Sequence, residues 1–153
     1  MATGTLAPPS KKLLTAEEFF DRHGSESHVD LVDGIVVRYP MPGSKHGLST
    51  LKLGRRIGNY VEDNRLGRSF SNDTFIKVKS NPDRMRGADI AYLSYKQWAE
   101  DAEVPDGPLP AMPELVAEVK SPSDSWPEVE VKVQDYLDAG VQIVLVLDPA
   151  GLA

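Results

Sequence analysis

The sequence predicts an α/β domain in which helices flank a central mixed β-sheet. Apolar residues recur with strand spacing in some segments and with helical spacing in others, and the last third of the chain has the order strand, helix, strand. The 153 residues are 41% hydrophobic and 26% charged, which is typical of one globular domain with its own core. We expect residues 1–12 to form a flexible lead-in and residues 13–153 to form a single domain.

Two elements are predicted near the N-terminus. Thr15 is followed three residues later by Glu18, ahead of two phenylalanines, which is the pattern of a capping box. We therefore expect a helix over residues 15–23, ended by the glycine that follows. Residues 29–39 are rich in valine, leucine and isoleucine around an Asp-Gly pair, which is typical of a two-residue hairpin turn. They predict two short antiparallel strands.

A longer helix is predicted over residues 44–64, after a segment broken by prolines and glycine. Its apolar residues recur with helical spacing, at Leu48, Leu51, Leu53, Ile57, Tyr60 and Val61. A second face, spaced by three or four residues, carries Lys52, Arg55, Arg56 and Asn59. The charge of this second face suits contact with a nucleic-acid backbone.

The rest of the chain predicts the remaining strands. Residues 70–78 and 88–93 are predicted strands, residues 95–103 a helical turn or two, and the proline-rich residues 105–113 an irregular loop. The predicted strand, helix and strand of the last third then follow, over residues 115–119, 125–139 and 142–147. A crossover of this length implies parallel pairing, and the continuous apolar run of the last strand predicts burial on both faces.

Charge is unevenly distributed along the chain. The net charge of −6 at pH 7 by itself argues against a high-affinity binder of polyanions. Residues 38–86, however, contain 11 basic and 4 acidic residues, whereas the remainder carries a net charge of −13. Phosphate contacts depend on local potential, so a nucleic-acid surface and an ordinary solvated basic surface both stay open.

Several classes of protein are excluded by what the sequence lacks. There is no cysteine, which removes disulfides, thiolate metal sites and cysteine nucleophiles. The longest apolar run, residues 141–147, is too short to cross a bilayer, and residues 1–10 lack the pattern of a signal peptide, so we expect a cytoplasmic protein. Phosphate-binding loop, dinucleotide-binding, nucleophile-elbow and zinc-protease motifs are also missing.

Two predicted strands that are otherwise apolar each carry an acid, Asp89 and Glu118. An ionised carboxylate in such a strand is costly unless it is paired or bound to a cation. Lys120 stands two residues after Glu118, so strand spacing places both side chains on the same face. Two carboxylates and a backbone carbonyl are oxygen ligands that suit Mg²⁺, and a cation beside a lysine is typical of phosphodiester hydrolysis.

A purely structural interpretation competes with the catalytic one. An isolated Glu-x-Lys pattern is common by chance. Glu118 and Lys120 would then form an ion pair at the end of a strand, and Asp89 would mark a turn.

Longer motifs point to one family. The run PELVAEVKSPSDS begins at Pro113, KVQDYLDAGV follows at Lys132, and VLVLDP ends at Pro149. Upstream, LVDG follows Asp30 and RGADIAYL surrounds Asp89, in the order that the family shows. Together these motifs resemble the Uma-two family of restriction-endonuclease-like proteins, within the PD-(D/E)XK nuclease superfamily, from about residue 14 to residue 149.

The resemblance implies a restriction-endonuclease-like core and roles for particular residues. Asp89 and Glu118 would bind the metal together with the backbone carbonyl of Val119, and Lys120 would be the motif lysine. Many family members instead keep a lysine on the following helix, where this chain has Lys132, so both lysines stay candidates.

Two further residues are candidates at the edge of this site. Asp30 stands where the family usually has Glu, and is either a third acid of the site or a hairpin residue. His46 opens the long helix and either contacts a phosphate there or is simply a polar residue at a helix start.

The function that we expect is a metal-dependent endonuclease that hydrolyses nucleic acid, most readily DNA, with Mg²⁺ or Mn²⁺ as cofactor. Lys52, Arg55 and Arg56 would hold the phosphate backbone. Two alternatives stay open: a non-catalytic module that binds nucleic acid or a protein partner on a nuclease scaffold, and a hydrolase of small phosphoesters walled by residues 105–113. The resemblance also admits a homodimer, and family members usually continue with further strands beyond the position of Pro149.

Overall fold

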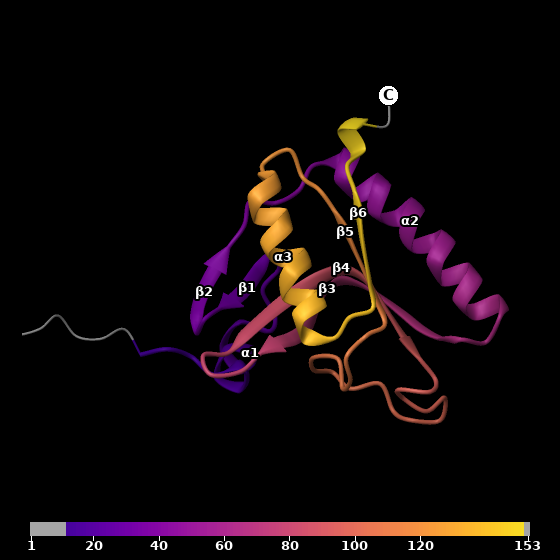
Figure 1. Ribbon diagram of the computed structural model, residues 1–153, viewed down its shortest axis with the longest axis horizontal. Helices are drawn as coiled ribbons and strands as arrows, with labels where there is room; N and C mark the ends of the chain where they lie inside the picture. The colour runs from indigo at the N-terminus through magenta and orange to yellow at the C-terminus, as the bar shows by residue number, and fades with distance from the viewer. Residues whose placement is uncertain (1–11, 152–153) are drawn as a thin grey trace, which may run out of the picture.

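The computed structural model describes residues 12–151, so the predicted lead-in lies almost wholly outside the described residues. The chain forms three α-helices, six strands and one short 3-10 helix (Figure 1). In chain order they are α1 (Ala16–His23), β1 (Val29–Val32), β2 (Ile35–Arg38), α2 (Ser44–Asp63), β3 (Gly67–Lys79), β4 (Arg84–Ser94), β5 (Leu115–Val119), α3 (Trp126–Ala139), β6 (Ile143–Leu147) and η1 (Pro149–Gly151).

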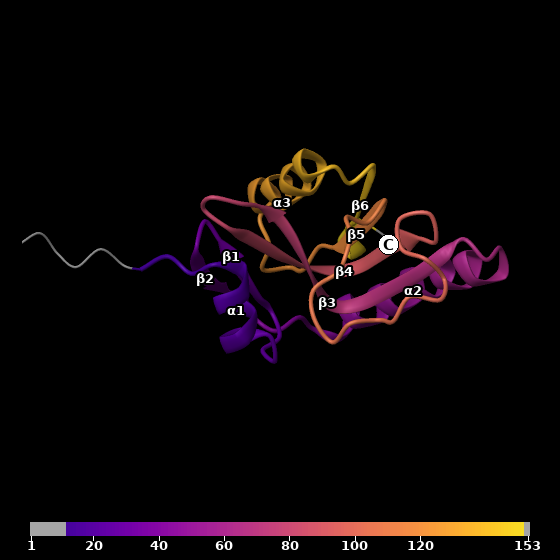
Figure 2. The ribbon, with the colours of Figure 1, turned by 90° about the horizontal axis from the view of Figure 1, so that it is seen from below.

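All six strands belong to one mixed sheet. Its order is β2-β1-β4-β5-β6, with β3 also paired to β4. Every pair is antiparallel except β5 with β6, which the α3 crossover makes parallel. Helix α3 covers one face of the sheet, and α1 and α2 lie on the other (Figure 2). This arrangement confirms the predicted α/β fold with flanking helices.

Local signals in the sequence account for several element boundaries. The Thr15 side chain accepts a hydrogen bond from the Glu18 N–H, and the Glu18 side chain bonds back to Thr15, so the predicted capping box is present. Asp33 and Gly34 have φ values of 49° and 78°, the positive pair that a tight hairpin turn requires. Helix α3 ends at Gly140, whose φ of 105° favours glycine.

The predicted apolar face of α2 is only partly correct. Leu48, Leu51 and Tyr60 are exposed, by 54%, 70% and 65% respectively. The helix instead packs through a narrower row of residues that begins at His46 and ends at Val61, both of which are buried. Between them Gly54 brings the helix backbone close to the Ile90 side chain. A glycine-lined contact leaves little room for large side chains, so the leucines stay outside.

Two expectations about local structure have different outcomes. Residues 95–103 form hydrogen-bonded turns, with the Trp98 N–H bonded to the Ser94 carbonyl, in agreement with the predicted helical turn or two, and the Arg68 guanidinium donates hydrogen bonds to the carbonyls of Ala99, Glu100 and Ala102. Strand β6 is not buried on both faces, since it is the last strand in the order of the sheet and its Ile143 is 51% exposed.

Two apolar clusters stabilise the sheet from its opposite ends. The first, between the sheet and α3, contains the buried residues Ile76, Ala88, Ala91, Val116, Tyr136 and Val141. The second, between the hairpin and α1, contains Phe19, Val29, Leu31, Phe75 and Met85. Within residues 12–151, each helix is too short or too polar to span a bilayer.

The αL cap of α3 gives a test of the fold. We expect Gly140→Ala to lower the free energy of unfolding by about 1–2 kcal/mol, because a Cβ is disfavoured at positive φ even though the space around Gly140 is open. Gly107→Ala is the control, since it also has open space but no positive φ, and it should change stability by less than about 0.5 kcal/mol. Urea denaturation measures both, and equal effects would contradict the assignment.

Candidate active site

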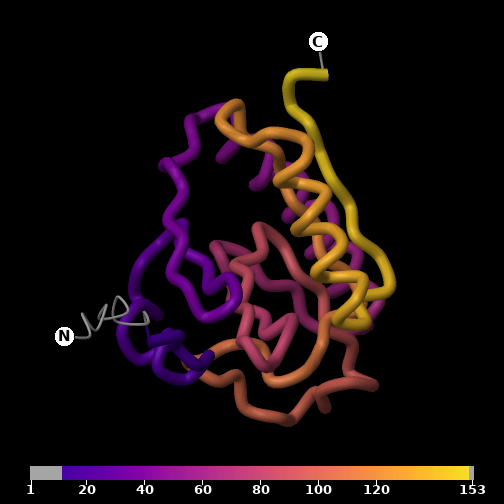
Figure 3. Tube along the Cα trace, turned by 60° about the vertical axis from the view of Figure 1, so that its left-hand side comes forward, coloured from indigo at the N-terminus to yellow at the C-terminus, as the bar shows by residue number. Residues whose placement is uncertain are grey.

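A cavity of about 630 Å³ lies between the β1–β2 hairpin, the β4–β5 pair and α3. In Figure 3 the hairpin and α3 stand on opposite sides of this region, and the chain segments that precede α2 and α3 approach it from one end. The cavity is lined by every residue predicted for the metal and the catalytic chemistry: Asp30, His46, Asp89, Glu118, Val119, Lys120 and Lys132. The fold thus brings together residues separated by up to a hundred positions in the sequence.

The two predicted metal ligands come from the neighbouring strands β4 and β5. The last paired residues before the cavity are Ile90 and Ala117, so Asp89 and Glu118 occupy the next positions on facing strands. There the strands separate, and the Asp89 carboxylate accepts a hydrogen bond of 2.7 Å from the Val119 N–H. The Asp89 side chain therefore links β4 to β5 at the point where the two strands separate.

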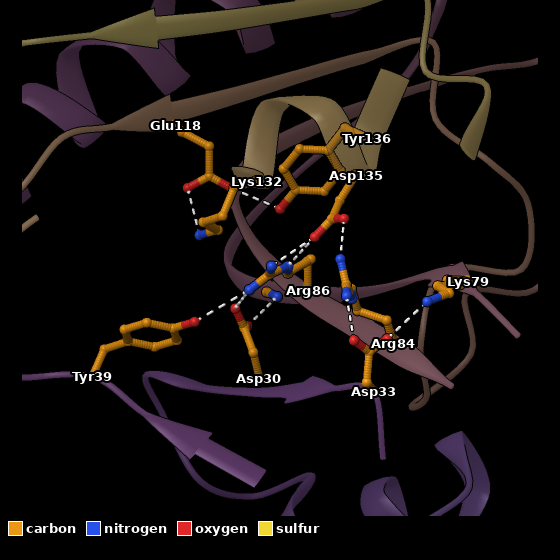
Figure 4. Close-up of polar contacts among 11 residues, drawn as sticks. Asp30, Asp33, Tyr39, Lys79, Arg84, Arg86, Glu118, Lys132, Asp135 and Tyr136 are labelled. Atoms are coloured by element: carbon orange, nitrogen blue, oxygen red, sulfur yellow. Dashed lines mark hydrogen bonds and ion pairs between the residues drawn. The ribbon is translucent and has the colours of Figure 1, made fainter. Parts of the chain in front are cut away.

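Glu118 is held by two residues of α3 (Figure 4). Its Oε2 accepts a hydrogen bond of 3.1 Å from the Lys132 ammonium, and its Oε1 accepts one of 2.7 Å from the Tyr136 hydroxyl. Lys132 and Tyr136 are spaced by four positions, which places them on the same face of the helix. One helical turn thus positions the carboxylate of the adjacent strand.

Burial shapes the protonation of these groups. Burial and the negative charge of Asp89 raise the pKa of Glu118 to about 7, although the positive charge of Lys132 lowers it. Burial opposes the charged form of Lys132, but the carboxylates of Glu118 and Asp30 outweigh this effect and hold its pKa above the usual value. A buried carboxylate whose pKa is raised in this way is stabilised in its ionised form when a cation binds to it.

Asp89 has a second partner in His46, near the start of α2. His46 Nε2 lies 3.4 Å from Asp89 Oδ2, and both side chains are largely buried. The bond to Asp89 raises the pKa of His46, whereas burial opposes ionisation of Asp89 but is outweighed by His46 and the Val119 N–H, so the pKa of Asp89 is lowered. The role found for His46 is therefore contact with a candidate metal ligand.

Asp30 is engaged by an arginine of β4 (Figure 4). Arg86 Nη1 lies 3.0 Å from Asp30 Oδ2, and the Gly87 N–H donates a hydrogen bond of 2.9 Å to Asp30 Oδ1. The same guanidinium forms an ion pair of 2.6 Å with Asp135 of α3. Arg86 thus pairs with both carboxylates. Through it, Asp30 of the β1–β2 hairpin is connected to β4 and to Asp135 of α3 beside the cavity.

The two candidate lysines have different surroundings. Lys132 contacts Glu118, whereas Lys120 Nζ donates to the Ser121 carbonyl over 3.3 Å and lies 5.7 Å from the centre of the Trp126 ring. Lys120 follows the end of β5, so its side chain stands at the mouth of the cavity. The helix lysine is thus the one in contact with the carboxylate.

Some predicted residues lie elsewhere. Lys52, Arg55 and Arg56 are exposed on α2, but they do not line the cavity. Much of the basic segment is neutralised by acids, since Lys77, Lys79, Arg84 and Arg86 all form ion pairs. Among the described residues, none of the proline-rich loop 105–113 lines the cavity, so the loop is not the pocket wall that the third hypothesis requires.

Sequence reasoning missed three residues that support the site: Tyr136, Arg86 and Asp135. For Tyr136 the available signal is its spacing, because it stands four residues after Lys132 in the predicted helix and so lies on the same face. Arg86 had a signal, because a charged residue within a largely apolar segment needs a partner, as does Asp89 three residues later.

The fold of the chain, a mixed sheet with helices on both faces, is shared with a solved structure. The chain is similar to a solved structure described as "a putative nuclease belonging to DUF820 from Anabaena variabilis ATCC 29413". The TM-score is 0.75 at 23% sequence identity, over 90% of this chain and 75% of the other. A search of curated proteins finds no match.

The family follows from the sequence profile. The profile of Uma2, described as "Putative restriction endonuclease", matches residues 16–152, and the chain belongs to this family. The resemblance inferred from the motifs around Asp89 and Glu118 is confirmed. Membership places the chain, at a general level, among nucleases, which are hydrolases acting on nucleic acid.

The buried arginine gives a prediction about stability. We expect Arg86→Met to lower the free energy of unfolding by about 3–5 kcal/mol, because it leaves the Asp30 carboxylate buried without its ion-pair partner. Adding Asp30→Asn should recover part of this loss. Arg65→Met is the control, since its pair with Glu100 is exposed and should contribute less than about 1 kcal/mol. A small effect of Arg86→Met in urea denaturation would contradict the structure.

His46 gives a prediction about pH. We expect NMR titration of the imidazole in EDTA to give a pKa above the ordinary value of about 6.5, and Asp89→Asn to lower it. Since the pKa of His46 is raised on folding, its stabilising contribution is complete below the unfolded pKa and is lost as pH rises through the folded pKa. His46→Gln assigns the resonance. A pKa at or below the ordinary value would show that the contact with Asp89 does not form in solution.

Proposed function

We propose that the protein is a metal-dependent endonuclease that hydrolyses phosphodiester bonds of DNA at the cavity formed by the hairpin, β4, β5 and α3. The observation that carries the proposal is the placement of Asp89 and Glu118 at facing positions of β4 and β5, with Lys132 in contact with Glu118. The family and the fold support a nuclease in general, and the arrangement of these residues supports this position for its chemistry.

The donor set fits Mg²⁺ or Mn²⁺ held by few protein ligands. Within residues 12–151, no three His, Asp or Glu side chains are grouped so as to hold a metal ion. Mg²⁺ often binds one or two carboxylates and completes its coordination with water and substrate phosphate. Asp89 and Glu118, with the backbone carbonyl of Val119, would hold the cation in this way. Such a cation would supply positive charge that stabilises the transition state of phosphodiester hydrolysis.

The surrounding residues have separate tasks in this proposal. Lys132 carries positive charge into the cavity and lowers the pKa of Glu118 against the effect of burial, while Tyr136 fixes the orientation of this carboxylate. His46, near the start of α2, orients Asp89 through a direct contact. Lys120, at the mouth, is placed to contact the phosphate of an incoming strand. Lys52, Arg55 and Arg56 would extend the contact with the backbone along α2.

One observation favours the second candidate, a binding module that retains the nuclease scaffold. Both oxygens of Glu118 are already engaged, one by Lys132 and the other by Tyr136. A carboxylate satisfied in this way needs no cation, and a site closed by internal bonds is compatible with a purely structural role. The two candidates differ in whether Glu118 exchanges these partners for a metal.

Cleavage of supercoiled plasmid and of single-stranded DNA tests the proposal. We expect cleavage with Mg²⁺ or Mn²⁺ that is abolished by EDTA and reduced at least about 100-fold by Asp89→Asn or Glu118→Gln, because each change removes a charged ligand. Glu130→Gln is the matched control, an exposed acid of α3 that should cleave as the unmodified protein does. Calorimetry with Mg²⁺ alone reports binding independently of activity.

The outcomes separate the candidates. If the unmodified protein binds metal and cleaves DNA, and both variants lose metal binding and cleavage, the endonuclease is supported. A folded protein that binds neither Mg²⁺ nor Mn²⁺ and cleaves no substrate, but binds DNA, supports the module. Cleavage that persists in Asp89→Asn and Glu118→Gln would place the chemistry elsewhere in the molecule.

A further inference from the structure

Trp126 is exposed although it is the largest side chain of α3. It is the first residue of the helix, and 49% of its surface is accessible. Among the described residues it is not part of either apolar cluster. Exposure of a tryptophan has a cost, since its large apolar surface stays in water. The packing of the fold therefore gives no reason for a tryptophan at this position.

The other tryptophan of the chain has a clear structural role. Trp98 stacks on Phe70 with ring centres 6.2 Å apart, and Arg68 lies 4.6 Å from its ring centre. These contacts attach the loop after β4 to β3. For Trp126 the aromatic or cationic contact found among the described residues is Lys120, with Nζ 5.7 Å from the ring centre. Trp126 is thus positioned next to a cation instead of within a core.

Trp126 does not line the cavity itself, but it lies beside residues that do. Lys120 lines the cavity, two residues after Glu118 on the same chain segment. Pro127, which follows Trp126 at the start of α3, lines it as well. An aromatic ring and an ammonium group therefore lie next to each other at the border of the cavity that holds the candidate metal ligands.

We propose that Trp126 and Lys120 form a subsite for one nucleotide of single-stranded nucleic acid, in which the base stacks on the indole ring and an adjacent phosphate contacts the lysine. This inference rests on the proposed function, since it names the substrate class of the same site. Proteins that bind single strands combine stacking on aromatic side chains with basic groups that contact the backbone. Both parts are present here within one short segment of chain.

The geometry favours a single strand over a duplex. In a duplex each base is already stacked on its neighbours. The indole ring can therefore stack only on a base that is unpaired or extruded from the helix. Lys120 and Trp126 are adjacent in space, and the spacing between a base and its own phosphate is short enough for both to be contacted together. A duplex would reach Lys120 through its phosphates but would gain nothing from Trp126.

Binding without cleavage tests this inference. The full chain in EDTA is titrated against three fluorescein-labelled probes by anisotropy: a twelve-nucleotide thymidine strand, an abasic strand of equal length, and a twelve-base-pair duplex. The variants are Trp126→Ala, Trp126→Phe and Lys120→Ala. Leu137→Ala is the matched control, because Leu137 is a similarly exposed apolar residue of α3, at 43%, that does not line the cavity.

We expect Trp126→Ala to weaken binding of the thymidine strand about 5- to 150-fold, the range given by stacking of one base. Trp126→Phe should retain most of the affinity, since it keeps an aromatic face. The abasic strand and the duplex should be nearly insensitive to Trp126→Ala. Lys120→Ala should reduce the slope of log affinity against log salt by about 0.7 for single strands, whereas Trp126→Ala should leave the slope unchanged.

Two results would overturn the subsite. One is unchanged binding of the thymidine strand by folded Trp126→Ala; the other is an equal loss for the thymidine and abasic strands, which would mean that no base is stacked. Equal losses for single strand and duplex would overturn the choice of substrate. The titration contains no metal, so its result does not depend on cleavage. If the cleavage assay contradicts the endonuclease, a positive binding result still supports the subsite, and failure of the subsite leaves the endonuclease untouched.

Discussion

The pairing of Arg86 with two acids is the interaction on which the geometry of the site depends. Its guanidinium, 3% exposed, joins Asp30 of the hairpin to Asp135 of α3 across β4. These are the three elements that surround the cavity. Asp135 lies next to Tyr136 and three residues after Lys132, so the ion pair also fixes the rotation of α3 that presents both side chains to Glu118. A hydrophobic cluster could hold the helix in place, but it would set this rotation less sharply.

The uneven distribution of charge is compatible with the proposed nucleic-acid site on an acidic protein. Basic residues of β3 and β4 are used inside the molecule, where they compensate buried or half-buried carboxylates. Among the exposed cations are Lys52, Arg55 and Arg56 of α2, and Lys120 lines the cavity. Net charge thus describes the whole chain, whereas the potential that a phosphate meets is set by a few positions.

Much of the fold could be predicted because its signals are local. The capping boxes at Thr15 and Ser125, the Asp-Gly turn and the cap at Gly140 each fix a boundary through bonds within a few residues. The site was predicted from two acids in apolar strands. What could not be predicted depends on tertiary contacts: which face of α2 packs through Gly54, and that β6 ends the sheet. Which of Lys120 and Lys132 contacts Glu118 likewise depended on the position of α3 over β5.

The short crossover from β5 through α3 has an evolutionary consequence. A strand end and the following helix both point cationic side chains into one cavity, because Lys120 and Lys132 are only twelve positions apart in sequence and approach it from two elements. In the proposed site, the fold therefore offers two positions for positive charge, one at the strand end and one on the helix. The lysine of the motif could change position between them in evolution without a change of backbone.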